Sequence, residues 1–238
     1  MKFFAYQEDL DRQQKKILSR IRQLMNGETS HQLHMSGMNY EKAFGVSLVH
    51  LRQLAKDFEP NNDLAERLWF RNIRETMILA TMLAQPDVLT DDQILGWAGQ
   101  INNIELAEQV AFNMVGRKKN IVSVIEDWIF HPVIYVRYTA LMSIGWHFRF
   151  IGKDLSKVVA DNLATFDALA SDKTMIRSVT HCLKMAGRFN PDLAIPISQL
   201  AKGWGESEDV LLQTAGLDIL EEIKLDKPNT FQGGNQKS

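Results

Sequence analysis

The chain has 238 residues, of which 45% are hydrophobic and 24% are charged, and it contains a single cysteine. This composition excludes a wholly disordered or fibrous chain, and one cysteine cannot form an intrachain disulfide. No apolar run approaches the roughly 18 residues that cross a bilayer. The first residues turn acidic by Glu8, Asp9 and Asp11, where a secretory signal would continue apolar. We therefore expect a cytoplasmic protein with no membrane partner.

Charge is distributed unevenly along the sequence. The whole chain carries 27 Lys and Arg against 29 Asp and Glu, a net charge of −2. Residues 111–190, however, hold 11 basic and 6 acidic side chains (+5), whereas residues 1–110 carry −3 and residues 191–238 carry −4. Local charge drives the release of counterions from a nucleic acid, so the middle segment is compatible with phosphate binding. A solvated surface with chance clustering explains it equally well.

Helical periodicity runs through almost the whole chain, and strand-like alternation is hard to find. Leu48, Leu51 and Leu54 recur at a spacing of three residues, behind a good N-cap residue at Ser47. Thr90, followed by two aspartates, marks another helix start. The sequence predicts an all-α fold with helices at residues 7–26, 47–57, 63–71, 73–84, 91–100, 104–115, 119–130, 134–151, 155–169, 174–187, 192–202 and 208–223.

Two segments lack this pattern. Residues 26–44 are weakly patterned and are expected to link the first helix to the main body. The tail from Lys224 is polar and rich in Gly, Asn and Lys, so it cannot bury enough apolar surface to stay ordered. We expect a single domain over residues 1–223 and a disordered tail over residues 224–238.

A similar helix start recurs along the chain, at Arg74, Arg137, Arg177 and Gln213. The last two steps are 40 and 36 residues, and the first step of 63 residues leaves room for an additional helix pair. HEAT and armadillo repeats have a period of about 40–47 residues. The pattern predicts a HEAT-like or armadillo-type α-helical solenoid of antiparallel helix pairs. The second helix of each pair would line a concave face shaped to hold a rod such as duplex DNA.

Three stretches carry a resemblance to a known family: FGVSLVHLRQLAK from Phe44, the stretch from LAERLWFRNIRET to INNIELAEQ, and VRYTAL. They resemble the DNA alkylation repair family of HEAT-like helical-repeat DNA glycosylases, over roughly residues 40–203. The most specific parts are Gly45-Val46-Ser47, the Leu68 to Glu75 stretch and the helix opening at Trp97. The resemblance implies a basic concave cleft that grips double-stranded DNA. It also implies that active members release cationic N3- or N7-alkylated purines without fully extruding the base.

The chemistry of such a reaction determines which side chains its site needs. An alkylated purine is positively charged, so an aromatic face attracts it through a cation–π contact. Cleavage of the glycosidic bond moves positive charge onto the sugar, and a nearby carboxylate stabilises that charge and orients the attacking water. The resemblance implies a site of this kind, made of two Trp and one Asp.

Matched position by position, the family's Asp falls on Glu108, its first Trp on Ile104 and its second Trp on His181. The family's nearby Arg falls on Lys184, and its basic DNA-contacting residue matches Arg137. Glu108 keeps a carboxylate that is one methylene longer, whereas Ile104 has no π face. A protonated His181 would repel a cationic base.

Trp146 is the alternative for the second aromatic position. With Ser143, Gly145 and Arg149 it resembles the second Trp motif locally, but it lies 38 residues after Glu108, about one repeat too early. The spacing therefore favours a packing role for Trp146. Trp69, Trp97 and Trp128 sit among apolar residues at helical spacing and are assigned to the core, and Cys182 to a buried, inert position.

The cluster from Arg117 to Lys119 follows Gly116 at a helix junction. It is either a set of solvated charges at a helix end or a loop that touches phosphate. His31, His34 and His50 lack a zinc-type pattern, so we expect no metal and no other cofactor. The residues expected to contact DNA are all basic: Arg137, Arg177, Lys184, Arg117, Lys118 and Lys119.

These assignments favour a monomeric helical-repeat protein that binds double-stranded DNA and lacks efficient glycosylase activity, because both Trp positions are lost. Two alternatives stay open. One is an active DNA glycosylase for N3- or N7-alkylated purines, with Glu108 as the catalytic carboxylate and His181 as the stacking group. The other is a protein-binding helical-repeat scaffold, since one fold serves many functions.

Overall fold

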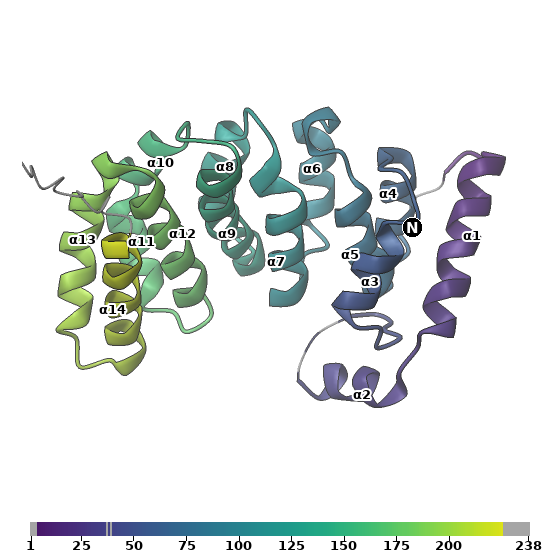
Figure 1. Cartoon of the computed structure of the whole chain (residues 1–238), viewed down its shortest axis with the longest axis horizontal. Helices are drawn as coiled ribbons and strands as arrows, with labels where there is room; N and C mark the ends of the chain where they lie inside the picture. Colours follow the sequence, from purple (N-terminus) through teal and green to yellow (C-terminus); the bar gives the residue numbers. More distant parts are fainter. Residues whose placement is uncertain (1–3, 37, 39, 226–238) are drawn as a thin grey trace, which may run out of the picture.

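A computed structural model describes residues 4–36, 38 and 40–225 of the chain (Figure 1). These residues form fourteen α-helices and two short 3-10 helices, and they contain no strand beyond an isolated bridge between Lys42 and Ile73. The predicted all-α fold is confirmed. No helix in this part of the chain has the length and apolarity needed to cross a membrane. In chain order the elements are α1 (Glu8–Gln23), α2 (Gly27–Met35), α3 (Leu48–Ala55), α4 (Asn62–Trp69), α5 (Arg74–Leu83), η1 (Pro86–Val88), α6 (Asp91–Ala98), α7 (Ile104–Asn113), η2 (Val115–Arg117), α8 (Val122–Ile129), α9 (Ile134–Phe150), α10 (Ser156–Asp161), α11 (Leu163–Ala170), α12 (Ile176–Phe189), α13 (Pro191–Gly205) and α14 (Val210–Leu225).

The helices are arranged as successive pairs in a row, from α1 at one end to α13 and α14 at the other (Figure 1). Helix α4 packs on α5, α8 on α9, α11 on α12 and α13 on α14. The second helices of the pairs also pack on one another in sequence, α5 on α7, α7 on α9, α9 on α12 and α12 on α14. We call this series the second-helix row. It is the helical solenoid that the repeated helix starts predict.

One apolar core runs through the whole row, from Leu10 in α1 to Ile219 in α14. Trp69, Trp97 and Trp128 are all fully buried in it, and the rings of the first two stack with centroids 4.5 Å apart. Their predicted assignment to the core is confirmed. Large aromatic side chains of this kind bury more apolar surface than any other residue and therefore stabilise the contacts between pairs.

Helix ends follow local capping chemistry where the sequence predicts it. The Ser47 side chain accepts a hydrogen bond from the His50 N–H at the start of α3. Thr90 and Gln93 form a reciprocal capping box at the start of α6. Both predicted starts are confirmed, because each side-chain oxygen satisfies an N–H that has no partner inside its helix.

Two predicted segments differ from the structure. Residues 27–35, expected to be part of a link, form α2, which buries none of its residues and so has no apolar periodicity to reveal it. Its N-cap is Asn26, whose side chain accepts from the Thr29 N–H. The single helix expected over residues 155–169 is divided into α10 and α11, because the Asn162 amide donates back to the Val158 carbonyl (2.9 Å) and its backbone leaves helical geometry.

The end of the chain differs in part as well. Helix α14 continues through Leu225, so the first residues of the tail expected to be disordered, from Lys224, are helical. The rest of the predicted tail, residues 226–238, lies outside the described residues.

The motif that resembles the family most closely forms a buried clamp between the loop before α3 and the start of α5. Glu75 is fully buried and accepts hydrogen bonds from the N–H groups of Phe44 (3.0 Å) and Val46 (3.2 Å). Arg74 donates to the Val46 carbonyl (2.8 Å) and forms ion pairs with Glu75 (3.0 Å) and with Glu105 of α7 (2.5 Å). Buried charges of this kind are tolerated only when they are paired and hydrogen-bonded.

Two further residues complete this arrangement. The Tyr40 hydroxyl donates to Glu105 (2.9 Å), and burial together with the charge of Glu105 raises the pKa of Tyr40. Gly45 has φ +75°, and a Cβ there would lie 2.1 Å from the Asn26 carbonyl oxygen. Only glycine fits this left-handed position without displacing α2. We call Tyr40, Arg74, Glu75 and Glu105 the N-terminal clamp; its contacts join the loop before α3 to α5 and α7.

Candidate nucleic-acid interface

Glu108 lies where α7, α9 and α12 meet in the second-helix row. Its carboxylate accepts a hydrogen bond from the Tyr138 hydroxyl of α9 (2.9 Å) and forms an ion pair with Arg177 of α12 (3.0 Å). Burial and the charge of Glu108 raise the pKa of Tyr138, so this phenol keeps its proton and remains a donor. The Glu108 side chain is 25% exposed and that of Arg177 is 71% exposed. We call Tyr138, Glu108 and Arg177 the central triad; in it the carboxylate already has a cationic partner.

Ile104 is the first residue of α7 and its side chain is 38% exposed. It lies four residues before Glu108 on the same helix, and residues at this spacing share one face. The structure therefore brings Ile104 and Glu108 together at the surface, as the matched motif implies. Its aliphatic side chain offers an apolar contact and no ring.

His181 extends from α12 toward α9 and packs against Trp146, with ring centroids 4.5 Å apart and planes inclined by 50°. A Cβ on Gly145 would lie 2.5 Å from the His181 ring, so glycine permits this close crossing. Burial, followed by the charges of neighbouring Lys and Arg side chains, lowers the pKa of His181 from 6.5 to about 4. The imidazole is therefore neutral near neutral pH and does not repel a cation.

Trp146 belongs to an aromatic cluster that joins α7, α9 and α12. Its ring stacks on Phe150 (centroids 5.6 Å apart, planes at 10°) and meets the edge of Phe112 (4.9 Å, 80°). The guanidinium of the exposed Arg149 lies 5.8 Å from the Trp146 ring. Trp146 thus packs between helices and also contacts His181, so the two candidates for the second aromatic position are neighbours in space.

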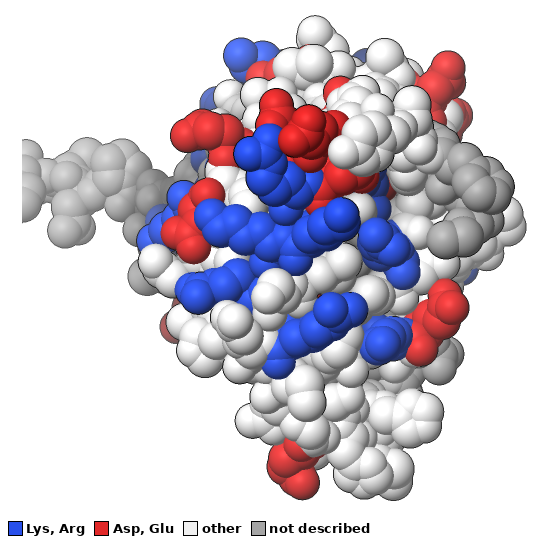
Figure 2. All heavy atoms as spheres, turned by 90° about the vertical axis from the view of Figure 1, so that its right-hand side faces the viewer, with Lys and Arg blue, Asp and Glu red and all other residues white. Residues whose placement is uncertain are grey.

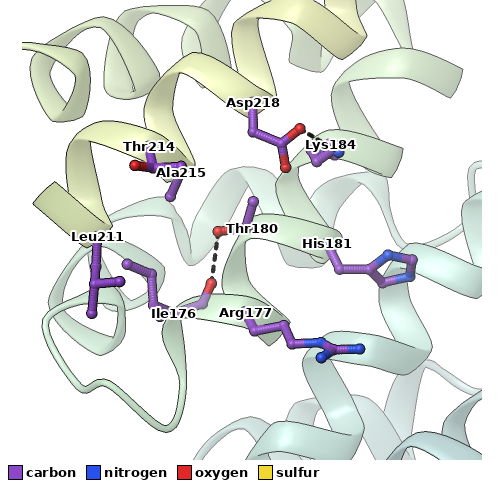
Figure 3. Close-up of a pocket in the computed structure, with 9 residues that line it drawn as sticks. All are labelled: Ile176, Arg177, Thr180, His181, Lys184, Leu211, Thr214, Ala215 and Asp218. Carbon is purple, nitrogen blue, oxygen red and sulfur yellow. Dashed lines mark hydrogen bonds and ion pairs between the residues drawn. The ribbon is translucent and has the colours of Figure 1, made fainter.

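A cavity of about 380 Å³ lies between α12 and α14, next to the central triad (Figure 3). Figure 3 shows that Leu211, Thr214, Ala215 and Asp218 come from α14 and that the other lining side chains come from α12. The residues that line it combine apolar, cationic and acidic groups: Ile176, Arg177, Thr180, His181, Lys184, Leu211, Thr214, Ala215 and Asp218.

Two of the cations expected to contact DNA are engaged within the protein. Lys184 is only 19% exposed at its side chain and forms ion pairs with Asp218 (2.7 Å) and Glu222 (3.7 Å) of α14. Arg137 turns back on the preceding loop, where it donates to the His131 carbonyl (2.7 Å). Neither side chain is presented to the solvent as an unpartnered charge.

The three cations of the 117–119 cluster have different surroundings. Lys118 is buried, and its ammonium donates to the Leu89 carbonyl (2.8 Å). Lys119 is exposed with its ammonium 3.7 Å from Asp87, and Arg117 is exposed with its guanidinium 4.0 Å from an aromatic ring of the cluster around Trp146. Arg117 and Lys119 are accessible to a phosphate, whereas the ammonium of Lys118 is buried and already hydrogen-bonded within the protein.

No group of three or more His, Cys, Asp or Glu side chains within residues 4–36, 38 and 40–225 is placed to hold a metal ion. Cys182, expected to be buried, has no exposed surface, and this burial raises the pKa of its thiol. It is an inert core residue, as predicted.

A second group of exposed cations lies on α1: Lys15, Lys16, Arg20 and Arg22. Figure 2 looks onto this end of the molecule and shows Lys and Arg side chains gathered across it. The sequence carries a signal of this group, since residues 12–27 contain five Lys and Arg and no Asp or Glu. Averaging over residues 1–110 conceals it.

A comparison with known protein families identifies the family of this chain. The model of the family described as "DNA alkylation repair enzyme" matches residues 17–195. The chain belongs to this family. Its membership confirms the predicted resemblance.

Two solved structures resemble this member of the DNA alkylation repair family. One, described as "A new family of proteins related to the HEAT-like repeat DNA glycosylases with affinity for branched DNA structures", has a TM-score of 0.75 and 17% identity over 89% of this chain and 94% of that chain. The other is a designed armadillo repeat protein in complex with the peptide (KR)4, with a TM-score of 0.43 and 12% identity over 90% of this chain and 94% of that chain. No match is found among the curated proteins. The first likeness confirms the HEAT-like fold.

Proposed function

We propose that this protein is a DNA-binding member of the DNA alkylation repair family with little or no glycosylase activity. The observation that supports this most directly is the central triad. A glycosylase carboxylate stabilises a sugar cation by presenting negative charge to it. Here the guanidinium of Arg177 lies 3.0 Å from the Glu108 carboxylate and opposes that charge.

The side chains around Glu108 also bind a cationic base weakly. Ile104 supplies no π face, and His181 directs its ring against Trp146. Each cation–π contact that is absent removes about 0.5–2 kcal/mol of attraction. Two such losses, about 1–4 kcal/mol together, reduce the rate by about fivefold to several hundredfold, since about 1.4 kcal/mol corresponds to a factor of ten.

The exposed cations of the second-helix row support binding to the DNA backbone. The side chain of Arg177 is 71% exposed, so a phosphate can bind its guanidinium from the solvent side while Glu108 keeps its ion pair. A guanidinium also binds phosphate through two parallel hydrogen bonds. Arg149, Arg117 and Lys119 supply further accessible charge, whereas Lys118 and Lys184 have structural roles in this proposal.

A salt titration tests the DNA-binding part. For the full chain, the logarithm of the duplex binding constant should fall linearly with the logarithm of the salt concentration. Arg177→Gln should lower that slope by about one, because one phosphate contact is lost. Lys157→Gln, an exposed cation of α10, is the matched control and should leave the slope unchanged. Because a similar solved structure is described as having affinity for branched DNA, the titration should include a branched as well as a linear duplex.

An excision assay on duplex containing 7-methylguanine tests the catalytic part. The wild-type chain should release little or no base, and Glu108→Gln should make no difference. Efficient release that falls about a hundredfold in Glu108→Gln would instead establish an active glycosylase. Absence of binding to any duplex at low salt would reject the DNA-binding function and favour a protein-binding scaffold.

A further inference from the structure

Helix α1 is amphipathic, and only one side of it is covered. It buries Leu10, Gln14, Ile17 and Ile21 and packs on α4. The opposite side faces away from the row at the end of the molecule (Figures 1 and 2). Four exposed cations lie on this side or at its margins. We call them the N-terminal basic face: Lys15, Lys16, Arg20 and Arg22.

Among the described residues, no carboxylate lies within 4.0 Å of any of these four charges, whereas the neighbouring Arg12 is paired with Asp9 (2.6 Å). Arg71, from the loop after α4, adds a further exposed cation beside α1, because its guanidinium donates to the neutral Gln14 side chain (3.1 Å). The contrast with the second-helix row is clear, since Arg177 and Lys184 both have carboxylate partners there.

An ordinary solvated helix surface does not explain this pattern. The helix dipole favours cations in the last turn, which accounts for Arg20 and Arg22 but not for Lys15 and Lys16 in the middle of α1. Lys16 and Arg20 are also four residues apart, a spacing at which like charges destabilise a helix. The end of a solenoid needs only a polar outer face, and mixed charges would serve that purpose. Lys16 has local contacts of its own, because its ammonium lies 5.3 Å from the centroid of the Phe58 ring and it lines a cavity together with Asp57 and Glu59. Lys15, Arg20 and Arg22 form no such contact among the described residues, and a group of cations of this kind is suited to a polyanion.

We propose that the N-terminal basic face binds the phosphate backbone of a second duplex segment, separate from the duplex held at the second-helix row. The identity of the ligand rests on the proposed function. Lys15 and Arg22 are seven residues apart, about 10 Å along the helix at about 1.5 Å per residue. That length spans about three phosphates of one strand, which are spaced by about 3.4 Å along the duplex axis.

The composition of the face distinguishes a nucleic acid from a membrane. Helices that bind an anionic bilayer place bulky apolar side chains beside their cations, and these side chains insert among the lipids. The exposed residues of α1 beside these cations, Ser19 and Gln23, are polar, and the exposed apolar side chains nearest in the sequence, Tyr6 and Met25, lie outside the helix. In addition, α1 and the α12 to α14 cavity lie at opposite ends of the row, so the two sites do not compete for one phosphate group (Figure 1).

The test uses the full chain with four substitutions, Lys15→Gln, Lys16→Gln, Arg20→Gln and Arg22→Gln. Glutamine is a good helix former, so α1 should be retained, and circular dichroism confirms that it is. The control variant replaces four exposed lysines outside the face with Gln and has the same net charge: Lys153, Lys157, Lys202 and Lys224. The first measurement is the salt dependence of duplex binding. The second is bridging, in which protein bound to an immobilised duplex captures a labelled second duplex.

The wild-type chain and the control variant should bridge two duplexes, and the α1 variant should not. The α1 variant should also lower the salt slope by about 3–4, at about 0.9 per phosphate contact. The inference is overturned if the α1 variant bridges as well as the control. It is likewise overturned if the variant loses only its retention on phosphatidylserine vesicles, which would identify the face as a membrane site.

Failure of the proposed function gives a different result. If the α1 variant loses bridging while Arg177→Gln leaves the slope unchanged, the basic face stands, and the other duplex is held at a site that does not include Arg177. If the wild-type chain binds one duplex without bridging, the row stands and the basic face is rejected. If it binds no duplex, both are rejected.

Discussion

Helix α7 carries two carboxylates one turn apart, and each accepts hydrogen bonds or an ion pair from one Tyr and one Arg. Glu105 belongs to the N-terminal clamp, where the side chain of Arg74 is 4% exposed. Glu108 belongs to the central triad, where the side chain of Arg177 is 71% exposed. The two groups therefore have the same three residue types and differ mainly in their access to water.

That difference determines what each group can do. Burial alone would lower the pKa of Arg74, but the hydrogen bond and charge of Glu105 raise it above its ordinary value, so the guanidinium stays charged in the interior. Removing one member of a buried pair leaves an uncompensated charge, which is strongly destabilising. In the central triad Arg177 is exposed enough to meet an external anion, whereas Glu108 is 25% exposed. The clamp is therefore suited to holding the fold, and the triad is the group for which we propose a role in binding.

The largest expected effect comes from making the same substitution in both groups. Arg74→Met should lower the free energy of unfolding by about 3–5 kcal/mol, because Glu75 and Glu105 lose their shared cation. Arg177→Met should lower it by less than about 1 kcal/mol. Urea unfolding followed by circular dichroism measures both. Equal losses of unfolding free energy in the two variants would show that burial does not make the N-terminal clamp more important for stability than the central triad.

A smaller effect is expected at the glycine beside the clamp. Gly45→Ala should cost about 3 kcal/mol, because a Cβ at a left-handed φ would also meet the backbone of α2. Gly96→Ala is the control, since no atom within 4 Å would meet a Cβ at that position in α6. It should stabilise the protein by about 0.5–1 kcal/mol through helix propensity. Thermal unfolding of the two variants measures both stability changes. A Gly45→Ala protein as stable as the wild-type chain would contradict the left-handed backbone and close contact at Gly45.

The third prediction concerns His181, a buried group beside the exposed triad. Its pKa is about 4 in the folded chain and 6.5 ordinarily, so between these values the unfolded state binds more protons. Stability therefore falls as the pH falls, by about 2 kcal/mol between about pH 7 and pH 5. His181→Phe keeps a ring against Trp146 and should lose this part of the pH dependence. The free energy of unfolding is measured at both pH values in both proteins. The same pH dependence in the two proteins would show that the His181 imidazole is exposed to water rather than buried.

Much of the fold can be predicted from local sequence, because helix starts and apolar faces are local properties. Ser47 and Thr90 are examples, since each caps a helix through residues only three positions away. Helix α2 could not be predicted in the same way. It buries no side chain, and its position depends on contacts such as the hydrogen bond from Ser30 to the Ala43 carbonyl (2.9 Å).

The candidate site is less accessible to sequence reasoning, because the partner of each cation lies far along the chain. Arg177 pairs with Glu108, 69 residues earlier, and Lys184 pairs with Asp218, 34 residues later. The sum of charge over residues 111–190 includes these cations but not the carboxylates that pair with them. The sum of +5 therefore overstates the positive charge of the surface that the segment forms. The same averaging hides the charges of α1 among the carboxylates of residues 28–108.

The placement of charge along the row also affects how the molecule approaches a ligand. Its basic end is α1, and the other end carries Asp218, Glu221 and Glu222 on α14 together with the acidic loop before it. A chain with net charge −2 gains little attraction to a polyanion at long range. Within a Debye length of about 8–10 Å, however, the field of the polyanion exerts a torque that turns the basic end toward it. For the proposed DNA ligand, this torque would orient the α1 end toward the duplex before contact.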